Sequence, residues 1–187
     1  MHWDNLSERD ERVVSAQNAD RKFDISFVYA VAKRCGAGYP QVLVCSPFSA
    51  DIVPFPTLFW LTCPYLARKC GELESRQKIS ELESVFEQRE SEVKRWHEEY
   101  STLRAELVTP ETEGTVKKKS ESMWNSFVSS GAGGMNWRDA PSAVKCLHLQ
   151  TAGYLGMGWH PAEDSLKSML GNFECDNCIC NSSQREA

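Results

Sequence analysis

The chain has 187 residues, which is enough for one domain with a hydrophobic core and too few for two large ones. Its 26 acidic and 21 basic residues give a formal net charge of −5, so the field of the whole chain repels nucleic acids and anionic membranes. The first residues lack the apolar stretch of a signal peptide, and no stretch approaches the roughly 20 apolar residues of a membrane span. We therefore expect a cytoplasmic protein that binds neither nucleic acid nor membranes. Because reducing compartments disfavour disulfides, the eight cysteines favour metal or redox chemistry.

Three strands are predicted in the first third of the chain. Residues 1–20 are polar and precede a single domain, which we place at residues 21–165. Residues 24–35 and 41–48 are rich in β-branched and aromatic residues, and a turn containing glycine and proline separates them, as in two strands joined by a loop. Prolines flank residues 57–62, whose composition predicts a third strand.

A long helical stretch is predicted over residues 64–108, with a break near residues 74–78 where the apolar positions fall out of phase. After the break, apolar residues recur at two heptad positions, and Arg89 alone interrupts them. The stripe consists of Ile79, Leu82, Phe86, Val93, Trp96, Tyr100, Leu103 and Leu107. A repeat of about four heptads is long enough for helix-mediated self-association, but we favour a helix that packs back on the sheet.

The sequence after residue 108 predicts a linker, a second helical section and a tail. Residues 109–122 are polar and lack helical periodicity, which predicts a mobile linker. A glycine-rich turn then precedes a helix, with Asp139 in its N-cap region and Pro141 in its first turn. Residues 166–187 contain a short amphipathic helix and a cysteine-rich tail. The predicted fold class is α+β: a small sheet with a long amphipathic helix or helical hairpin and a C-terminal helical section.

Three blocks of sequence carry a family resemblance: RCGAGYPQV, PFPTLFWLTCPYL and GGMNWRDAPSAVKCLH. Together they resemble an uncharacterised bacterial family known only as a domain of unknown function. The resemblance covers about residues 25–165 and implies no activity, but it marks Cys35, Cys63, Cys146 and His148 among the positions of the family pattern. The chain departs from that pattern where a second histidine is usual and Gly153 stands instead, so a role that rests on that histidine does not carry over.

Three separated cysteines are candidate metal ligands. Cys63 lies directly before the helix predicted from Pro64, where unpaired backbone N–H groups and the helix dipole favour a thiolate. Cys35 precedes a glycine turn, and Cys146 lies within the predicted later helix. If the three converge, their thiolates suit zinc with a fourth ligand, or an iron–sulfur cluster with one open iron. The alternative is that these cysteines are packing residues, because buried apolar cysteines are common.

Two histidines are candidate acid–base groups, His148 and His97. On a regular helix at about 100° per residue, Cys146 and His148 point about 200° apart, so we expect them not to bind one metal. His148 is then expected to make a separate hydrogen bond or to act as a base from a neighbouring surface.

The tail sequence CDNCIC has a sharper local pattern. Cys175 and Cys178 have the C-x-x-C spacing that wraps a zinc or cluster iron, and Cys180 adds a third candidate ligand. A fourth ligand is expected from His160 or from the three separated cysteines. The alternative is a disordered tail whose thiols stay reduced.

The leading hypothesis from the sequence is a cysteine-ligated metal protein, with zinc or an iron–sulfur cluster, that acts on a small-molecule substrate. One alternative is a metal-free enzyme in which Cys63 is the nucleophile. Another is a non-catalytic interaction module that uses the amphipathic helix. These hypotheses belong to different classes, and the sequence leaves all three open.

Overall fold

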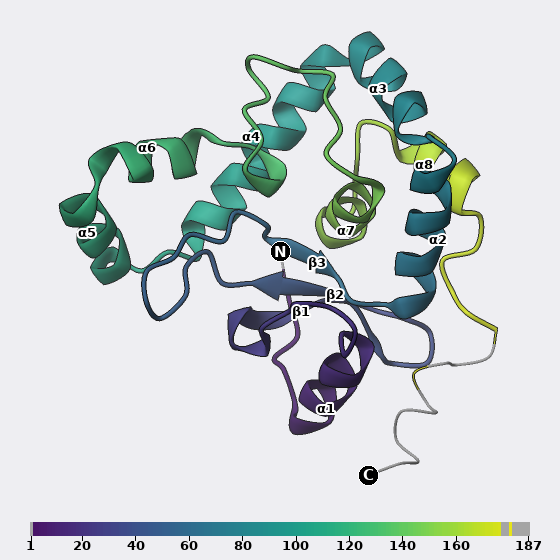
Figure 1. Ribbon diagram of the computed structural model, residues 1–187, viewed down its shortest axis with the longest axis horizontal. Helices are drawn as coiled ribbons and strands as arrows, with labels where there is room; N and C mark the ends of the chain where they lie inside the picture. Colours follow the sequence, from purple (N-terminus) through teal and green to yellow (C-terminus); the bar gives the residue numbers. More distant parts are fainter. Residues whose placement is uncertain (1, 177–179, 181–187) are drawn as a thin grey trace.

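A small antiparallel sheet runs through the middle of the computed structural model, which describes residues 2–176 and 180 (Figure 1). Its strands are β1 (Val28–Arg34), β2 (Pro40–Cys45) and β3 (Phe59–Leu61), in the order β1-β2-β3. Every residue of β2 is buried, as expected for a central strand with both faces covered. The three predicted strands and the α+β fold class are confirmed.

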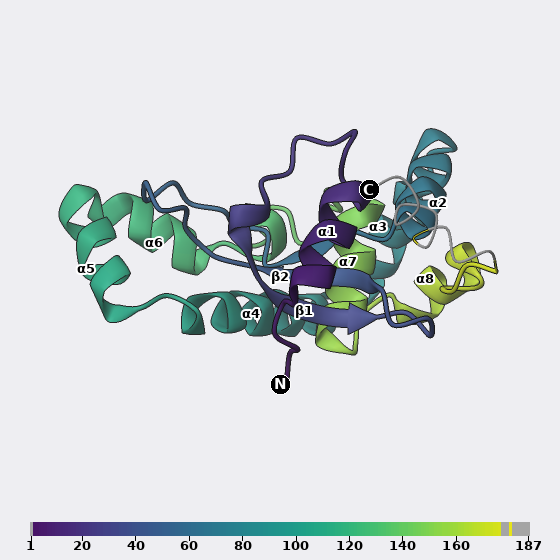
Figure 2. The same ribbon diagram turned by 90° about the horizontal axis from the view of Figure 1, so that it is seen from below.

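Helices pack against both faces of this sheet (Figures 1 and 2). Leu43 of β2 packs with Val14 of the N-terminal helix, whereas its neighbours Val42 and Val44 belong to the main core that includes the helix containing Ala152. This alternation follows from the two-residue period of a strand. The helices are α1 (Glu8–Gln17), α2 (Pro64–Ser75), α3 (Ile79–Gln88), α4 (Glu90–Glu106), α5 (Pro110–Lys119), α6 (Glu121–Ser129), α7 (Leu147–Met157) and α8 (Glu163–Leu170).

The long helical stretch is divided twice. The break predicted near residues 74–78 is confirmed, and Gln77 there has a positive φ of 59°. A second break, which was not predicted, falls at Arg89 between α3 and α4, where φ is −124° and ψ is 38°. Arg89 is the residue that interrupts the apolar stripe, and its Nη1 donates to the carbonyl of Pro161 at 2.9 Å. The polar residue therefore lies at a bend between two helices.

Most of the apolar stripe of α3 and α4 is buried within the chain, and Ile79, Leu103 and Leu107 are partly buried. Phe86, Val93, Trp96 and Tyr100 are each at most 1% exposed. The hydroxyl of Tyr100 accepts hydrogen bonds from the backbone amides of Leu58 and Phe59 at 2.7 and 3.2 Å. These contacts match the interpretation of a helix that packs back on the sheet.

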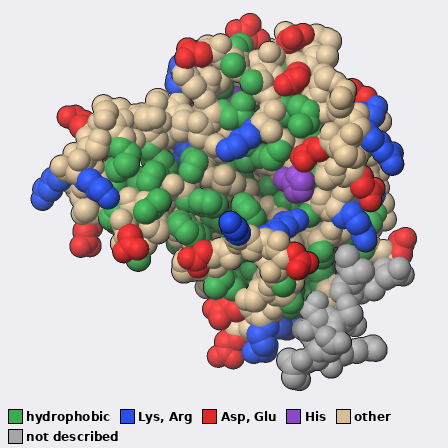
Figure 3. Space-filling view, in the orientation of Figure 1, with side chains coloured by type: hydrophobic (Ala, Val, Ile, Leu, Met, Phe, Trp, Pro, Cys, Tyr) green, Lys and Arg blue, Asp and Glu red, His purple; other side chains and the backbone are tan. Residues whose placement is uncertain are grey.

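The prediction of a mobile polar linker at residues 109–122 is corrected by the structure, because these residues form α5 and the start of α6. Thr109 caps α5 by accepting a hydrogen bond from the Thr112 amide at 3.2 Å, and Pro110 occupies the first turn. Val116 is fully buried and belongs to a small apolar cluster with Phe48 and Phe127. Figure 3 shows apolar side chains gathered on this side of the molecule beside α5 and α6.

The helix predicted from Asp139 begins later, at Leu147. Asp139 instead accepts a hydrogen bond from the side chain of Asn136 at 2.6 Å, within a turn. Such local bonding by Asn and Asp competes with helix formation. Cys146 is consequently the N-cap residue of α7, with extended backbone angles, and does not lie inside the helix.

The polar N-terminal segment also packs on the domain. Within α1, Asp10 is 5% exposed and accepts hydrogen bonds from both terminal nitrogens of Arg34, at 2.7 and 2.9 Å. Before the helix, Asp4 pairs with Val31 of β1 through two backbone hydrogen bonds. Within the described part of the chain, no helix is long and apolar enough to cross a lipid bilayer.

Candidate functional site

The N-terminus of α7 meets the C-terminal end of α2 (Figure 1). Glu74, near the end of α2, accepts hydrogen bonds through Oε1 from the amides of Leu147 and His148, at 2.6 and 3.4 Å. Cys146 accepts one from the Leu149 amide at 3.4 Å. A carboxylate and a thiol thus satisfy the amides that open the helix, where negative charge is favoured.

His148 joins the same group. Its Nδ1 lies 3.0 Å from Glu74 Oε1, and one donor atom from each of Glu74, Cys146 and His148 lies within 4.8 Å of the other two. Among the described residues, no other three His, Cys, Asp or Glu side chains meet this condition. The prediction that Cys146 and His148 point apart is wrong, because Cys146 caps the helix and is not one of its internal residues.

A pocket of about 390 Å³ lies against this group, and both Cys146 and His148 line it. Its walls are mainly apolar and include Phe59 and Trp60 from β3. Figure 3 shows a histidine on this face with basic and acidic side chains close by. The pocket can therefore hold a small molecule beside the three donor atoms.

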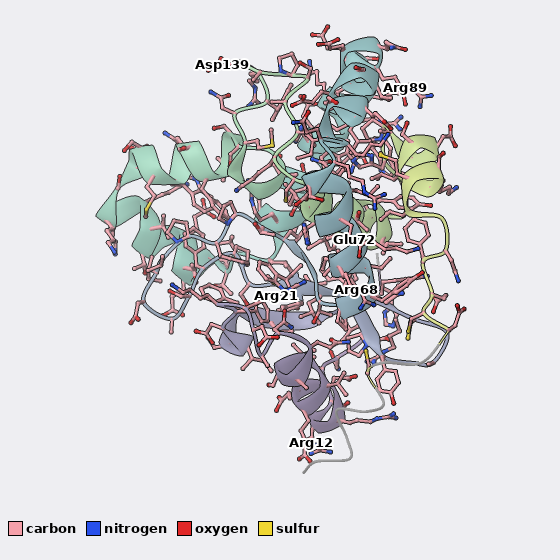
Figure 4. All side chains as sticks on the ribbon, turned by 45° about the vertical axis from the view of Figure 1, so that its right-hand side comes forward. Arg12, Arg21, Arg68, Glu72, Arg89 and Asp139 are labelled. Carbon is pink, nitrogen blue, oxygen red and sulfur yellow. The ribbon has the colours of Figure 1, made fainter. Side chains whose placement is uncertain are left out.

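Two basic side chains also line the pocket. Arg21, which Figure 4 shows between α1 and α2, donates through Nη1 to the carbonyl of Leu61 at 2.9 Å. Lys145 donates through Nζ to the carbonyl of Gly133 at 3.0 Å. Both contacts are with neutral carbonyl oxygens, so neither positive charge is neutralised by them. The pocket consequently favours an anionic ligand.

Protonation of Cys146 is governed first by burial, which raises the pKa of its thiol. The hydrogen bond from the Leu149 amide lowers the pKa, while the charge of Glu74 raises it further. The thiol therefore stays protonated at neutral pH unless an additional positive charge comes close. A divalent cation supplies that charge and deprotonates a thiol that coordinates it.

The donor set fits a metal ion chemically. Zinc binds thiolate sulfur, imidazole nitrogen and carboxylate oxygen, and three protein ligands with one open position are typical of catalytic zinc. Glu74 makes its contacts with α7 and His148 through Oε1, so Oε2 can serve as the metal ligand.

Four other cysteines line a second pocket of about 240 Å³: Cys35, Cys63, Cys175 and Cys180. The structure thus places Cys35 and Cys63 with two tail cysteines, and it places Cys146 at the other pocket. The convergence of Cys35, Cys63 and Cys146 on one site is not observed. Cys178 lies outside the described residues.

Cys63 is the N-cap residue of α2, as predicted, but it is not an activated thiolate. Burial raises the pKa of its thiol to about 11, and this outweighs the hydrogen bonds from the amides of Leu66 and Tyr65. The neighbouring thiols of Cys180 and Cys175 raise the pKa further. In the protein without a metal, desolvation therefore raises the pKa of Cys63 by more than the helix terminus lowers it.

The remaining candidate histidines lie in the core and line neither pocket. His97 is 1% exposed, accepts a hydrogen bond at Nδ1 from the Ala132 amide at 3.1 Å, and has its pKa lowered to about 4 by burial. His160 is 4% exposed, and its Nε2 lies 2.8 Å from Gln150 Oε1. His97 as an acid–base group and His160 as a ligand of the tail cysteines are not supported by these positions.

Two residues of the site were not identified from the sequence. Glu74 lies in a charged stretch near the predicted helix break, and Arg21 lies in the segment after α1. Neither has a local motif, because their partners are distant in the chain: Glu74 contacts His148 across 74 positions, and Arg21 contacts Leu61 across 40. Proximity to a helix break was the one signal for Glu74.

Comparison with protein families matches residues 31–167 to one described as "Protein of unknown function (DUF501)". The matched range includes Glu74, Cys146 and His148, together with Cys35 and Cys63, and it ends before the tail cysteines. No curated protein and no solved structure matched the chain.

Proposed function

Because the chain belongs to the DUF501 family, whose description carries no function, we propose from geometry alone that it is a zinc-dependent enzyme acting on a small anionic molecule. The ligands are Glu74, Cys146 and His148. The observation that carries the proposal is the meeting of these three donor groups beside a pocket with two basic side chains. The reaction class is metal-assisted hydrolysis.

Each protein group has a role that follows from its position. Glu74 Oε1 and His148 Nδ1 lie 3.0 Å apart, a separation that suits two ligands of one metal ion, so the imidazole can coordinate the metal through Nδ1. Cys146 contributes its sulfur from the N-terminal end of α7, where the backbone amides offset part of the negative charge of a thiolate. When bound, zinc at a three-ligand site acts as a Lewis acid and lowers the pKa of a coordinated water.

The pocket supplies binding and orientation. Arg21 and Lys145 attract the anionic part of the substrate, and the apolar walls formed by Phe59 and Trp60 exclude water from its neighbourhood. A pocket of about 390 Å³ limits the substrate to the size of a small metabolite.

The test is metal analysis of untagged protein, combined with substitutions on one helix. Glu74→Gln keeps an oxygen that can accept from the Leu147 amide but removes the carboxylate charge, so we expect zinc affinity to fall at least about tenfold. Glu72→Gln is the matched control, because Glu72 is exposed on the same helix and lines no part of this pocket (Figure 4). Equal zinc affinity in both variants would contradict the proposal.

A second candidate is a metal-free cysteine enzyme in which Cys146 is the nucleophile. The spatial arrangement of thiol, imidazole and carboxylate favours it, because Glu74 orients His148 beside Cys146. Burial, which raises the pKa of Cys146, works against it. Alkylation followed by mass spectrometry distinguishes the two: zinc should protect Cys146 in the metal enzyme, whereas the thiol enzyme predicts fast labelling that chelators do not change.

A further inference from the structure

The second pocket is lined by thiols from three parts of the chain. Cys35 follows β1, Cys63 precedes α2, and Cys175 and Cys180 belong to the C-terminal segment after α8. None of the seven described cysteines is in a disulfide. Segments separated by more than 100 residues thus bring four potential ligands to a space of about 240 Å³.

The turn that carries Cys35 is held in place. The Cys35 amide donates to the Tyr39 carbonyl at 2.9 Å, and the Gly38 amide donates to the Cys35 carbonyl at 2.8 Å. Gly38 has φ of 81°, which a residue with a Cβ rarely adopts. Arg34 ties the turn to α1 by donating to both carboxylate oxygens of Asp10 and to the Gly38 carbonyl. Cys35 is therefore presented by a preformed turn.

The C-terminal segment is bonded to the same place. Gln41 donates through Nε2 to the Phe173 carbonyl at 2.8 Å, and Glu174 accepts from the Gly36 amide at 2.9 Å. Gln17 donates through Nε2 to Cys180 Sγ at 3.1 Å. These bonds bring Cys175 and Cys180 to the turn of Cys35, and Cys180 also packs with Val13 and Tyr39 in a small apolar cluster.

We propose that Cys35, Cys63, Cys175 and Cys180 bind a structural zinc ion that fastens the C-terminal segment to the β1–β2 turn and the start of α2. Four thiolates form a closed tetrahedral set, which is typical of structural zinc and leaves no position for substrate. The site is therefore different in kind from the three-ligand group at α7. Its four ligands are separate from those of the proposed function, and only the total of two zinc ions expected per chain rests on both.

Zinc binding must draw the sulfurs together. Zn–S bonds of about 2.3 Å place tetrahedral sulfurs about 3.8 Å apart. Among the described residues, no three of these four sulfurs all lie within 4.8 Å of one another. Cys175 lies in irregular backbone, which can adjust, whereas Cys35 and Cys63 are fixed by the turn and by α2. The ion consequently orders the tail against the domain, and each coordinating thiol releases its proton.

The full chain, purified untagged and without oxygen, provides the test. Zinc analysis is expected to give two ions per chain, and Cys175→Ser and Cys180→Ser should each lower this to one. Cys175 lies in irregular backbone, and serine is close in size to the cysteine that it replaces at the buried position 180, so these variants keep the fold. Cys70→Ser is the control and should keep both ions, because Cys70 lines neither pocket and its contact with Thr151 Oγ1 at 3.4 Å suits a hydroxyl.

The two proposed zinc sites can be tested independently of each other. His148→Gln should remove the α7 ion alone, and Cys175→Ser the tail ion alone. Unchanged zinc content in Cys175→Ser and Cys180→Ser would overturn the tail site, as would iron with acid-labile sulfide in place of its zinc. Limited proteolysis gives a second readout: added zinc should slow cleavage after residue 171 at least about tenfold in the wild type but not in Cys180→Ser. Equal cleavage rates with and without zinc would also overturn the proposal.

Discussion

Glu74 Oε1 and His148 Nδ1 lie 3.0 Å apart, although 74 positions of sequence separate the two residues. The contact links the end of α2 to the beginning of α7, and the same carboxylate oxygen accepts from the Leu147 amide. Glu74 thus positions the helix and the candidate site with a single group. Loss of its charge and loss of its hydrogen-bonding capacity should therefore have different effects.

Replacement of Glu74 separates these effects. Glu74→Ala removes the acceptor for the α7 amides and should lower the free energy of unfolding by about 1–2 kcal/mol, as for loss of a helix cap. Glu74→Gln retains an acceptor and should cost less than half as much, while still losing the metal. Urea denaturation of the metal-free proteins measures this difference, and equal losses in the two variants would show that Glu74 does not cap α7.

The strands were predictable because prolines and glycines mark their ends and because β-branched residues fill them. The break before Ile79 was predictable because the apolar residues on its two sides are out of phase with each other along the helix. Helix α5 was missed, although Thr109, Pro110 and the lysines at its end are standard start and stop signals, because it buries little besides Val116 and so lacks periodicity.

The candidate site was only partly predictable. Cys146 and His148 were identified as a pair, but the helix was started too early, and that error gave the wrong angle between their side chains. Glu74 could not be paired with His148 because the contact depends on how α2 and α7 pack. The joining of Cys35 and Cys63 with the tail cysteines likewise depends on the tertiary fold and leaves no trace in local spacing.

Two buried histidines make stability depend on pH. Burial lowers the pKa of His97 to about 4 and that of His160 to about 3, from an ordinary value of 6.5. Above that value both are neutral in the folded and unfolded states. As the pH falls below it, only the unfolded state takes up protons, so each histidine lowers stability by up to about 1.4 kcal/mol per pH unit until its folded pKa is reached.

Urea denaturation between pH 7.5 and 5 measures this dependence. The His97→Gln variant should have a shallower dependence than the wild type, because its amide oxygen can accept from Ala132 without titrating. Identical slopes for the two proteins would mean that His97 is not buried in its neutral form.

Gly156 lets α7 lie close to β3. A Cβ at this position would lie 2.4 Å from Cδ1 of Phe59, so Gly156→Ala should cost about 1–3 kcal/mol in the free energy of unfolding. A Cβ at Gly114, within α5, would lie in open space with no contact from the described residues within 4 Å, so Gly114→Ala should stabilise by about 0.5–1 kcal/mol. Thermal unfolding compares the two, and a tolerated Gly156→Ala would argue against this close packing.

Arg104 is a fully buried cation, and within the part of the chain that the structure describes none of its hydrogen-bond partners is a carboxylate. Its guanidinium donates to the carbonyls of Pro56 at 3.0 Å and Gly131 at 2.9 Å, and to those of Phe127 and Ser130. Lysine cannot reproduce this planar set of donors, so Arg104→Lys should cost at least about 2 kcal/mol. Arg95→Lys, at an exposed position of the same helix, should change stability by less than about 0.5 kcal/mol in the same denaturation assay.

Anomalous X-ray scattering at the zinc absorption edge, from crystals of the untagged protein, tests the central claim most directly. We predict a peak within about 2.0–2.3 Å of one donor atom from each of Glu74, Cys146 and His148. Full occupancy of the three side chains without a peak between them, in crystals grown with zinc, would contradict the assignment of a metal site at the start of α7.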